Sequence, residues 1–239
     1  MPGSFKTEAV VLRSIRYGEA DRVLHLYTSE RGRLGAVAKG VRRVRSRMGG
    51  RLEPLCRVRL VLHEGRGELC TVTQVDTVHA HAALRERRAS LERAGQACEA
   101  VLRLLDSAEP NQPAYNLLCN ELALLDADPA AATRAHALAF RMKLLLAAGF
   151  APELASCASC GEGEHLGGFS PSAGGVVCAG CEAGSFPLAE DAHRFLAEAL
   201  GRPLAEAPEA PERALAQADR AIAETLEHHA HVRLRRVAA

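Results

Sequence analysis

Two Cys-x-x-Cys pairs lie 17 residues apart in the second half of the chain, Cys157 with Cys160 and Cys178 with Cys181. This spacing is typical of four-cysteine zinc sites, in which each CxxC turn directs two thiolates at one metal ion. The segment around them is polar and rich in glycine, so a core cannot hold it together and a metal would supply its folding free energy. The sequence therefore predicts one structural Zn²⁺ bound by all four cysteines in a zinc-ribbon-like element over about residues 153–186.

Other uses of these cysteines fit less well. A redox CxxC pair needs a thioredoxin-like strand–helix–strand context that is missing here. Four thiolates close a zinc site and leave no open position for catalysis. Disulfides conflict with the cytosolic setting expected for a chain without a recognisable secretory signal. The remaining cysteines stand singly at apolar positions and are interpreted as small core residues: Cys56, Cys70, Cys98 and Cys119.

The net charge of +1 hides an uneven distribution of charge along the chain. Residues 1–82 carry 15 basic and 8 acidic residues, a net of +7, and residues 83–239 carry 15 and 21, a net of −6. The excess is densest over residues 39–51, which contain glycines and no acidic residue. So much charge repels itself unless an anion neutralises it, and nucleic-acid phosphates are the commonest such anion. The predicted DNA-binding residues are Lys39, Arg42, Arg43, Arg45, Arg47 and Arg51, with Arg33 beside them. A solvated loop is the alternative.

Five segments of the first 80 residues alternate polar and apolar residues or are rich in β-branched residues, as strands are. They cover 7–16, 22–27, 33–39, 57–63 and 68–78. A closed barrel of the OB type is the most economical arrangement, because closure leaves no exposed strand edge, and an SH3-like barrel is the alternative. The basic segment then connects strands three and four at the rim. Aromatic residues that could stack on bases are few here, namely Phe5, Tyr17 and Tyr27, so arginine–phosphate contacts would dominate.

From Ala83 onward apolar residues recur three, four or seven positions apart, which is the spacing of one helix face. Helices are predicted over 83–105, 115–125, 129–148, 188–200 and 212–235. The third is expected to have Asp128 as its N-cap and Pro129 as its first residue. The sequence thus predicts a multidomain α+β fold. An OB-fold barrel spans residues 1–81 and an all-α helical domain spans 82–239, interrupted by the four-cysteine zinc-ribbon-like element.

The sequence contains no motif that would supply catalysis. A GxxxxGK[ST] phosphate loop, a GxSxG elbow and an HExxH zinc motif are all absent. Histidines gather at His79 and His81 and again at His228, His229 and His231, which we interpret as solvated or partner-facing surface. No stretch approaches the roughly 18 apolar residues that a membrane helix needs. The chain is expected to be a cytoplasmic protein without enzymatic activity.

Four blocks and a basic tail follow one another along the chain. They are residues 17–22 with 26–34, residues 36–43 with Ser46 and 52–55, residues 140–152 running into 157–161, residues 169–170 with 174–181, and the tail 226–236. Together these blocks resemble the RecO family of bacterial DNA repair proteins, which are recombination mediators. The resemblance covers essentially the whole chain. The tail is similar to the basic helix that closes members of the family.

The resemblance implies an N-terminal OB-fold, a helical domain and an embedded zinc-ribbon element. It implies binding of single- and double-stranded DNA and annealing of complementary strands coated with single-strand-binding protein. It also implies partnership with RecR, which helps to load the RecA recombinase onto single-stranded DNA, and association with the nucleoid. Two rival classes stay open. One is a zinc-ribbon adaptor or transcription factor that binds protein and does not anneal strands, and the other is a zinc enzyme such as a nuclease.

Overall fold

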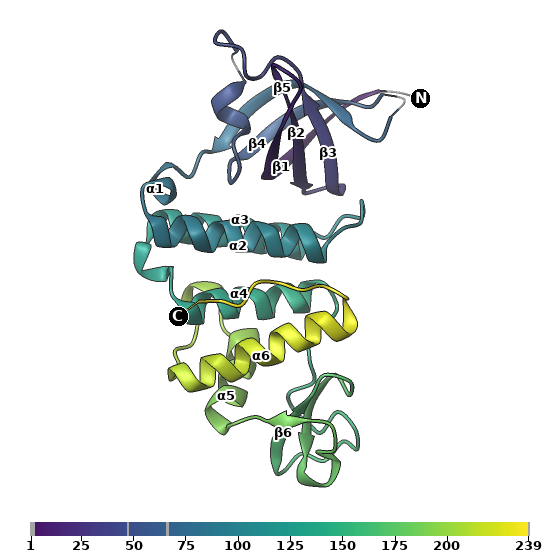
Figure 1. The fold of residues 1–239 in the computed structure, drawn as a ribbon, viewed down its shortest axis with the longest axis vertical. Helices are drawn as coiled ribbons and strands as arrows, with labels where there is room; N and C mark the ends of the chain where they lie inside the picture. The colour runs from purple at the N-terminus through teal and green to yellow at the C-terminus, as the bar shows by residue number, and fades with distance from the viewer. Residues whose placement is uncertain (1–2, 47, 66, 239) are drawn as a thin grey trace. The chain divides into compact units, whose positions relative to one another are not determined.

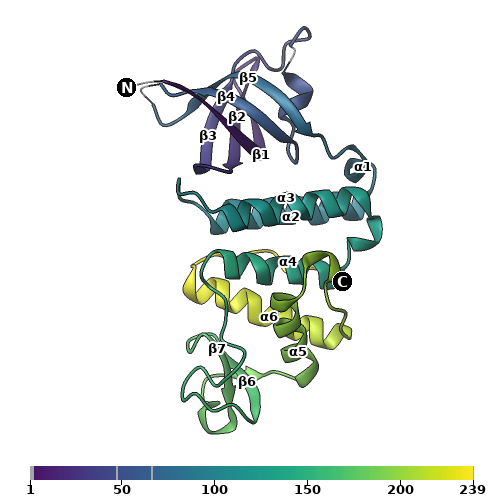
Figure 2. The ribbon, with the colours of Figure 1, turned by 180° about the vertical axis from the view of Figure 1, so that it is seen from behind.

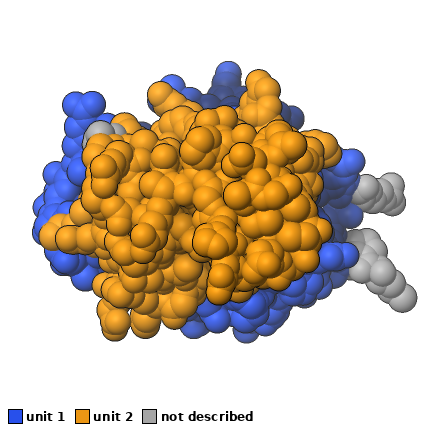
Figure 3. Space-filling model, turned by 90° about the horizontal axis from the view of Figure 1, so that it is seen from below, with its two compact units in different colours: residues 1–129 blue, residues 130–239 orange. Residues whose placement is uncertain are grey.

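The computed structural model describes residues 3–46, 48–65 and 67–238. It forms two compact units, residues 1–129 and 130–239, which are coloured separately in Figure 3. The domain boundary predicted from the sequence, between residues 81 and 82, is a different division that separates the barrel from the helices. It stays a prediction. The two units are described separately below.

The first unit begins with a closed five-stranded barrel (Figure 1). Its strands are β1 Ser4–Tyr17, β2 Asp21–Thr28, β3 Gly32–Ala38, β4 Arg57–His63 and β5 Cys70–His79. They follow one another around the barrel in the order β1-β2-β3-β5-β4, and β4 pairs with β1 to close it. Only the β3–β5 pairing is parallel. The five predicted strands are confirmed, and this barrel is the predicted OB-fold.

Alternation of residues along the strands fills the barrel interior. Leu24 and Leu26 of β2 and Leu60 and Leu62 of β4 are fully buried, whereas His25, Arg59 and Val61 beside them are more exposed. The long strand β1 has two partners: residues 4–10 pair with β4, and residues 9–17 pair with β2 across a bulge between Val11 and Arg13. The second half therefore extends to the rim where the basic segment begins.

Three helices complete the first unit: α1 Ala82–Arg85, α2 Arg88–Leu104 and α3 Gln112–Ala127. Helices α2 and α3 lie side by side in both views (Figures 1 and 2) and bury Val101, Leu118 and Leu122. The single helix predicted over 83–105 is wrong, because Arg87 has extended dihedral angles (φ −122°, ψ 111°) and separates α1 from α2.

The interpretation of His81 as solvated surface is also wrong. Its side chain is only 2% exposed, and its Nδ1 lies 2.7 Å from the main-chain oxygen of Leu55. Both residues have left-handed backbone conformations, with φ 47° at His81 and 74° at Leu55. This contact holds the chain where it leaves the barrel and enters α1.

The second unit contains three helices and a small sheet. The helices are α4 Arg134–Ala147, α5 Glu190–Gly201 and α6 Glu212–His229, and the strands are β6 Leu166–Ser170, β7 Gly175–Cys178 and β8 Phe186–Pro187. The sheet has the order β7-β6-β8. Phe140, Phe195 and Leu226 are among the buried residues of this unit. The chain also contains four short 3-10 helices. Gly49–Leu52 lies in the first unit, Pro129–Ala131 lies at the boundary, and Ala179–Cys181 and Leu204–Glu206 lie in the second unit.

Two predicted helix ends differ from the structure. Asp128 and Pro129 lead into a single 3-10 turn, and α4 begins after Thr133, whose hydroxyl accepts a hydrogen bond from the His136 N–H. The last helix ends at His229 because His231 adopts a left-handed conformation (φ 55°) and Val232 N–H donates back to the Leu226 carbonyl. Residues 230–238 of the tail are therefore not helical. Among the described residues, no helix has both the length and the apolar character needed to cross a bilayer.

Candidate nucleic-acid interface and metal centre

The four predicted metal ligands come together in the second unit. The Sγ atoms of Cys157, Cys160, Cys178 and Cys181 all lie within 4.8 Å of one another, and those of Cys160 and Cys178 are 3.7 Å apart. Metal–sulfur bonds of about 2.3 Å in a tetrahedron place the sulfurs about 3.8 Å apart. The arrangement and the donor set therefore fit a metal ion with four thiolate ligands.

Backbone hydrogen bonds shape the two cysteine turns. In the first turn, Gly161 N–H donates to the Cys157 carbonyl over 2.8 Å, and Gly161 has the positive φ of +81° that this turn requires. The Ala158 N–H donates to the Val176 carbonyl over 2.8 Å, which ties the first turn to β7. Strands β6 and β7 pair Phe169 with Val176, and Cys178 ends β7. The hairpin thus brings the second turn next to the first.

The closeness of the thiols changes how readily they ionise. The main-chain N–H of Cys178 donates to the Cys157 sulfur and, with other hydrogen bonds, lowers the pKa of Cys157 to about 6. Hydrogen bonds of the Cys181 thiol with Cys160 and Cys178 favour its protonated form and raise its pKa to about 12. Four thiolates at this separation repel one another, and a divalent cation is the group that would allow all four to ionise.

The basic segment between β3 and β4 is fixed to the turn between β1 and β2. We call residues 39–51 the arginine loop. Gly40 N–H donates to Asp21 Oδ1 over 2.7 Å, and Arg42 N–H donates to the Ala20 carbonyl over 2.9 Å. The Arg42 guanidinium donates to the carbonyls of Glu19 (3.1 Å) and Gly18 (3.4 Å). These bonds hold the start of the arginine loop on the rim of the barrel.

Most predicted cations of the loop face solvent. Lys39, Arg42, Arg43, Arg45 and Arg51 are all exposed, and within the part of the chain that the structure describes none of them forms an ion pair. Arg51 donates to the Val75 carbonyl over 3.2 Å. The predicted residue Arg47 lies outside the described residues. The loop therefore presents unneutralised positive charge, which is what binding a polyanion requires.

The structure does not bring Arg33 together with the loop. Arg33 lies at the start of β3, its N–H donates to the Ser107 carbonyl over 3.1 Å and its guanidinium to the Leu102 carbonyl over 3.3 Å. Lys39 follows the other end of β3, and six extended residues span about 20 Å. Arg33 thus contacts the region where α2 ends.

Sequence reasoning missed two exposed cations near the end of β1, Arg13 and Arg16, and named Tyr17 only as one of three aromatic residues of the barrel. Arg13, Arg16 and Tyr17 extend along the second half of this strand, towards the turn that the arginine loop contacts. Arg13 pairs across the strands with His25, whose pKa is lowered by burial and then by the nearby Arg33 and Arg13. The alternation in the predicted strand was the signal that could have placed Arg13 on the outer face.

Comparison with known proteins identifies the family. The family described as "Recombination protein O N terminal" matches residues 1–81, and "Recombination protein O C terminal" matches residues 93–237. The DNA repair protein RecO of Rubrobacter xylanophilus is 38% identical over 212 residues, covering 85% of this chain and 83% of the relative. That of Anaeromyxobacter dehalogenans strain 2CP-C is 38% identical over 238 residues, covering 96% of this chain and 92% of the relative. The chain belongs to the RecO family.

Membership in the RecO family confirms the resemblance predicted from the sequence, and with it a function in DNA repair by recombination. Each of the two matched regions contains one candidate site. The arginine loop lies within residues 1–81, and the cysteine cluster lies within residues 93–237.

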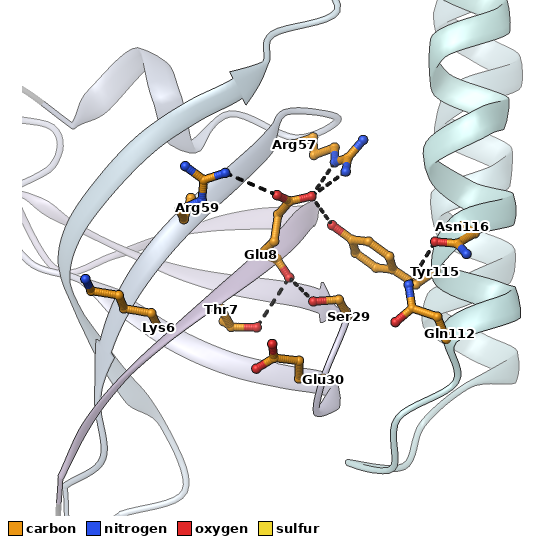
Figure 4. A pocket seen from close by; sticks show the side chains of 10 residues that line it. All are labelled: Lys6, Thr7, Glu8, Ser29, Glu30, Arg57, Arg59, Gln112, Tyr115 and Asn116. Carbon is orange, nitrogen blue, oxygen red and sulfur yellow. Dashed lines mark hydrogen bonds and ion pairs between the residues drawn. The ribbon is translucent and has the colours of Figure 1, made fainter.

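A groove of about 390 Å³ lies between the barrel and α3 within the first unit (Figure 4). Glu8 projects into it and accepts hydrogen bonds from Arg57 Nε (2.6 Å) and the Tyr115 hydroxyl (3.1 Å), and it also forms an ion pair with Arg59 (3.8 Å). Glu8 thus forms ion pairs with two cations of the groove, Arg57 and Arg59, whereas no ion pair is formed by the described cations of the arginine loop. In this RecO-family chain, the hydrogen bond from Tyr115 to Glu8 holds α3 against the barrel. We therefore assign the candidate nucleic-acid interface to the arginine loop.

Proposed function

We propose that this chain is a non-enzymatic DNA-binding recombination mediator. It binds single- and double-stranded DNA and anneals complementary strands. Together with RecR, it helps to load RecA onto single-stranded DNA coated by single-strand-binding protein. It acts in the cytoplasm, at the nucleoid. The observation that carries the proposal is the arginine loop, whose exposed cations have no ion-pair partner among the described residues, in a chain of a DNA repair family.

Binding rests on phosphate contacts. Lys39, Arg42, Arg43, Arg45 and Arg51 supply charge from one side of the barrel rim, and Arg47 belongs to the same run of sequence. Contacts to phosphates carry no base information, so binding is independent of sequence. It is also weakened by salt, because each neutralised phosphate releases a condensed counterion.

Annealing follows from the same charge. Two complementary strands repel each other through their phosphates, and a cationic surface that holds both lowers this repulsion while their bases pair. Because Arg42 is held by two main-chain carbonyls, its charge stays at the rim in a fixed position. No bond in the DNA needs to be broken or made for this activity.

The metal of the cysteine cluster is one structural Zn²⁺. Four thiolates leave no position for water or substrate, so the ion would stabilise the ribbon without taking part in a reaction. The residues that would hold it are Cys157, Cys160, Cys178 and Cys181. Their role is to connect the segment after α4 with the β6–β7 hairpin.

An annealing assay tests this function. Complementary strands are coated with single-strand-binding protein and mixed with the wild type or with the triple variant Arg42→Ala, Arg43→Ala, Arg45→Ala. The control triple variant removes three exposed, ion-paired arginines outside the loop: Arg88 in α2, Arg202 directly after α5 and Arg213 in α6. We expect the wild type and the control to anneal and the loop variant to be at least about tenfold slower. A wild type that binds protein partners but neither binds nor anneals DNA would establish the adaptor alternative.

A further inference from the structure

One aromatic ring on the barrel surface is not explained by the fold. The first 81 residues contain one phenylalanine and two tyrosines. One of the tyrosines, Tyr27, is buried and only 1% exposed. The ring of Phe5 is covered by the Arg31 guanidinium, which lies 3.7 Å from the ring centroid. Tyr17 is 59% exposed, and its hydroxyl and ring have no recorded partner among the described residues. Exposing this ring costs free energy that a ligand could recover.

Tyr17 lies next to the arginine loop. It is the last residue of β1 and pairs with Asp21, whose carboxylate accepts the hydrogen bond from Gly40. The residue after Tyr17 is Gly18, whose carbonyl accepts a hydrogen bond from the Arg42 guanidinium. One turn of the barrel therefore presents an exposed ring and an anchored cation within adjoining residues.

The surroundings of Tyr17 combine apolar and cationic groups. Ile15 lies two residues earlier on the same face of β1 and is 44% exposed, and Arg13 precedes it on that face. The nearby acids are Asp21, which is bonded to Gly40, and Glu19, which is exposed. The depressed pKa of His25, which arises from burial and then from Arg33 and Arg13, is consistent with a positive potential on this face. Apolar groups beside cations suit a ligand with flat apolar faces and an anionic backbone, which describes single-stranded nucleic acid.

We propose that Tyr17 is a stacking platform for an unpaired DNA base, and that it makes the rim of the barrel prefer single-stranded over double-stranded DNA. This inference rests on the proposed DNA-binding function and adds a specificity-determining residue to it. The loop cations bind phosphates of either form of DNA. The ring can bind only a base whose face is free, and in a duplex those faces are covered by neighbouring bases.

The preference can be measured with Tyr17→Ala and Tyr17→Phe. We expect Tyr17→Ala to weaken binding of a single-stranded oligonucleotide about tenfold, which is the order of one stacked base, and to change duplex binding less than twofold. Tyr17→Phe keeps the ring and should bind as the wild type does. The dependence of affinity on salt should stay the same in both variants, because no phosphate contact is removed.

A second comparison uses the unaltered protein and a strand of the same length without bases. The wild type should bind this abasic strand as weakly as Tyr17→Ala binds the normal strand, so the test does not depend on how well a variant folds. Tyrosine fluorescence gives a direct signal. The chain has no tryptophan and three tyrosines, and the other two are at most 2% exposed, so quenching by single-stranded DNA should come from Tyr17 and disappear in Tyr17→Phe.

The possible failures are distinguishable. If the wild type binds neither single strands nor duplex, the proposed function is wrong. If the wild type binds both, and Tyr17→Ala binds single strands with unchanged affinity or loses both forms equally, the stacking role of Tyr17 is wrong and the proposed function stands. Equal affinity of the wild type for the abasic and the normal strand would overturn the stacking role independently.

Discussion

The guanidinium of Arg42 donates a hydrogen bond of 3.1 Å to the main-chain oxygen of Glu19, in the turn between β1 and β2. A second bond of 3.4 Å reaches the neighbouring carbonyl of Gly18. Arg42 therefore anchors the arginine loop and also carries part of its charge. Both bonds come from the same guanidinium nitrogen, Nη1, and the shorter side chain of a lysine would keep the charge without placing a donor at the same position.

Arg42→Lys separates these two roles. We expect it to weaken DNA binding by about 2- to 10-fold, because a hydrogen bond that contributes on the order of 1 kcal/mol is lost while the charge is kept. Arg45→Lys is the matched control, since Arg45 is an exposed loop arginine with no recorded hydrogen bond in the described structure. Fluorescence anisotropy with a labelled single strand measures both. Equal effects of the two substitutions would show that the anchor contributes nothing to binding.

The cysteine cluster makes a prediction about metal content. Cys178→Ser should reduce bound zinc well below one ion per chain. It should also lower the free energy of unfolding of the second unit by about 3 kcal/mol or more, because metal binding is the main source of folding energy in small zinc elements. Elemental analysis and thermal unfolding measure the two effects. Cys119→Ala, which removes a buried core thiol, should leave the metal content unchanged. A stable wild-type protein free of metal would contradict the assignment.

Gly175 allows a close backbone approach beside the cluster. A Cβ at this position would lie 2.2 Å from the main-chain oxygen of Glu153, which also accepts a hydrogen bond from the Val176 N–H. Gly175→Ala should therefore destabilise the second unit by roughly 1–3 kcal/mol, as overpacking does. A Cβ at Gly163 meets nothing within 4 Å, so Gly163→Ala should be close to neutral. Chemical denaturation compares the two variants, and equal stability would show that the backbone adjusts without cost.

Burial of His81 predicts a dependence of stability on pH. Burial is the largest cause of its lowered pKa, and its ordinary value is 6.5. The unfolded chain therefore binds the proton more readily than the folded chain, so stability is fully present above about pH 6.5 and is lost as the pH falls below it. His81→Asn should weaken this dependence, since asparagine tolerates the left-handed backbone and cannot be protonated.

His165→Asn is the control for this pH effect. His165 also has a positive φ of 55°, but its side chain is 84% exposed, so the substitution should leave the dependence on pH unchanged. Urea unfolding at pH 7.5 and 5.5 gives the comparison. The account of His81 is wrong if its variant and the wild type lose the same stability between these two values.

Much of the fold could be predicted because it depends on local patterns. The alternation in residues 57–63 reproduces the bounds of β4, and the two CxxC turns carry their own spacing information. The OB-type barrel could be predicted from the number of strands, because closing five strands into a barrel leaves no exposed strand edge. The position of the arginine loop followed directly, because it is set by the order of the strands.

The remaining features depend on tertiary contacts that no local pattern contains. Thr133 caps α4 although Asp128 and Pro129 have the usual sequence signal of a helix start. Arg33 and Lys39 are close in sequence, yet an extended strand places them far apart. The strand pattern also did not show which aromatic ring of the barrel is exposed, because the burial of Tyr27 and the exposure of Tyr17 depend on tertiary packing.

The central claim is that the arginine loop binds DNA phosphates, and the dependence of single-strand affinity on salt tests it most directly. Each phosphate contact contributes about −0.7 to the slope of log affinity against log salt for single strands. Removing the side chains of Arg42, Arg43 and Arg45 should therefore weaken binding at low salt and make the slope shallower by about 2. An unchanged slope and affinity in this triple variant would contradict the claim and place the DNA-binding surface elsewhere on the molecule.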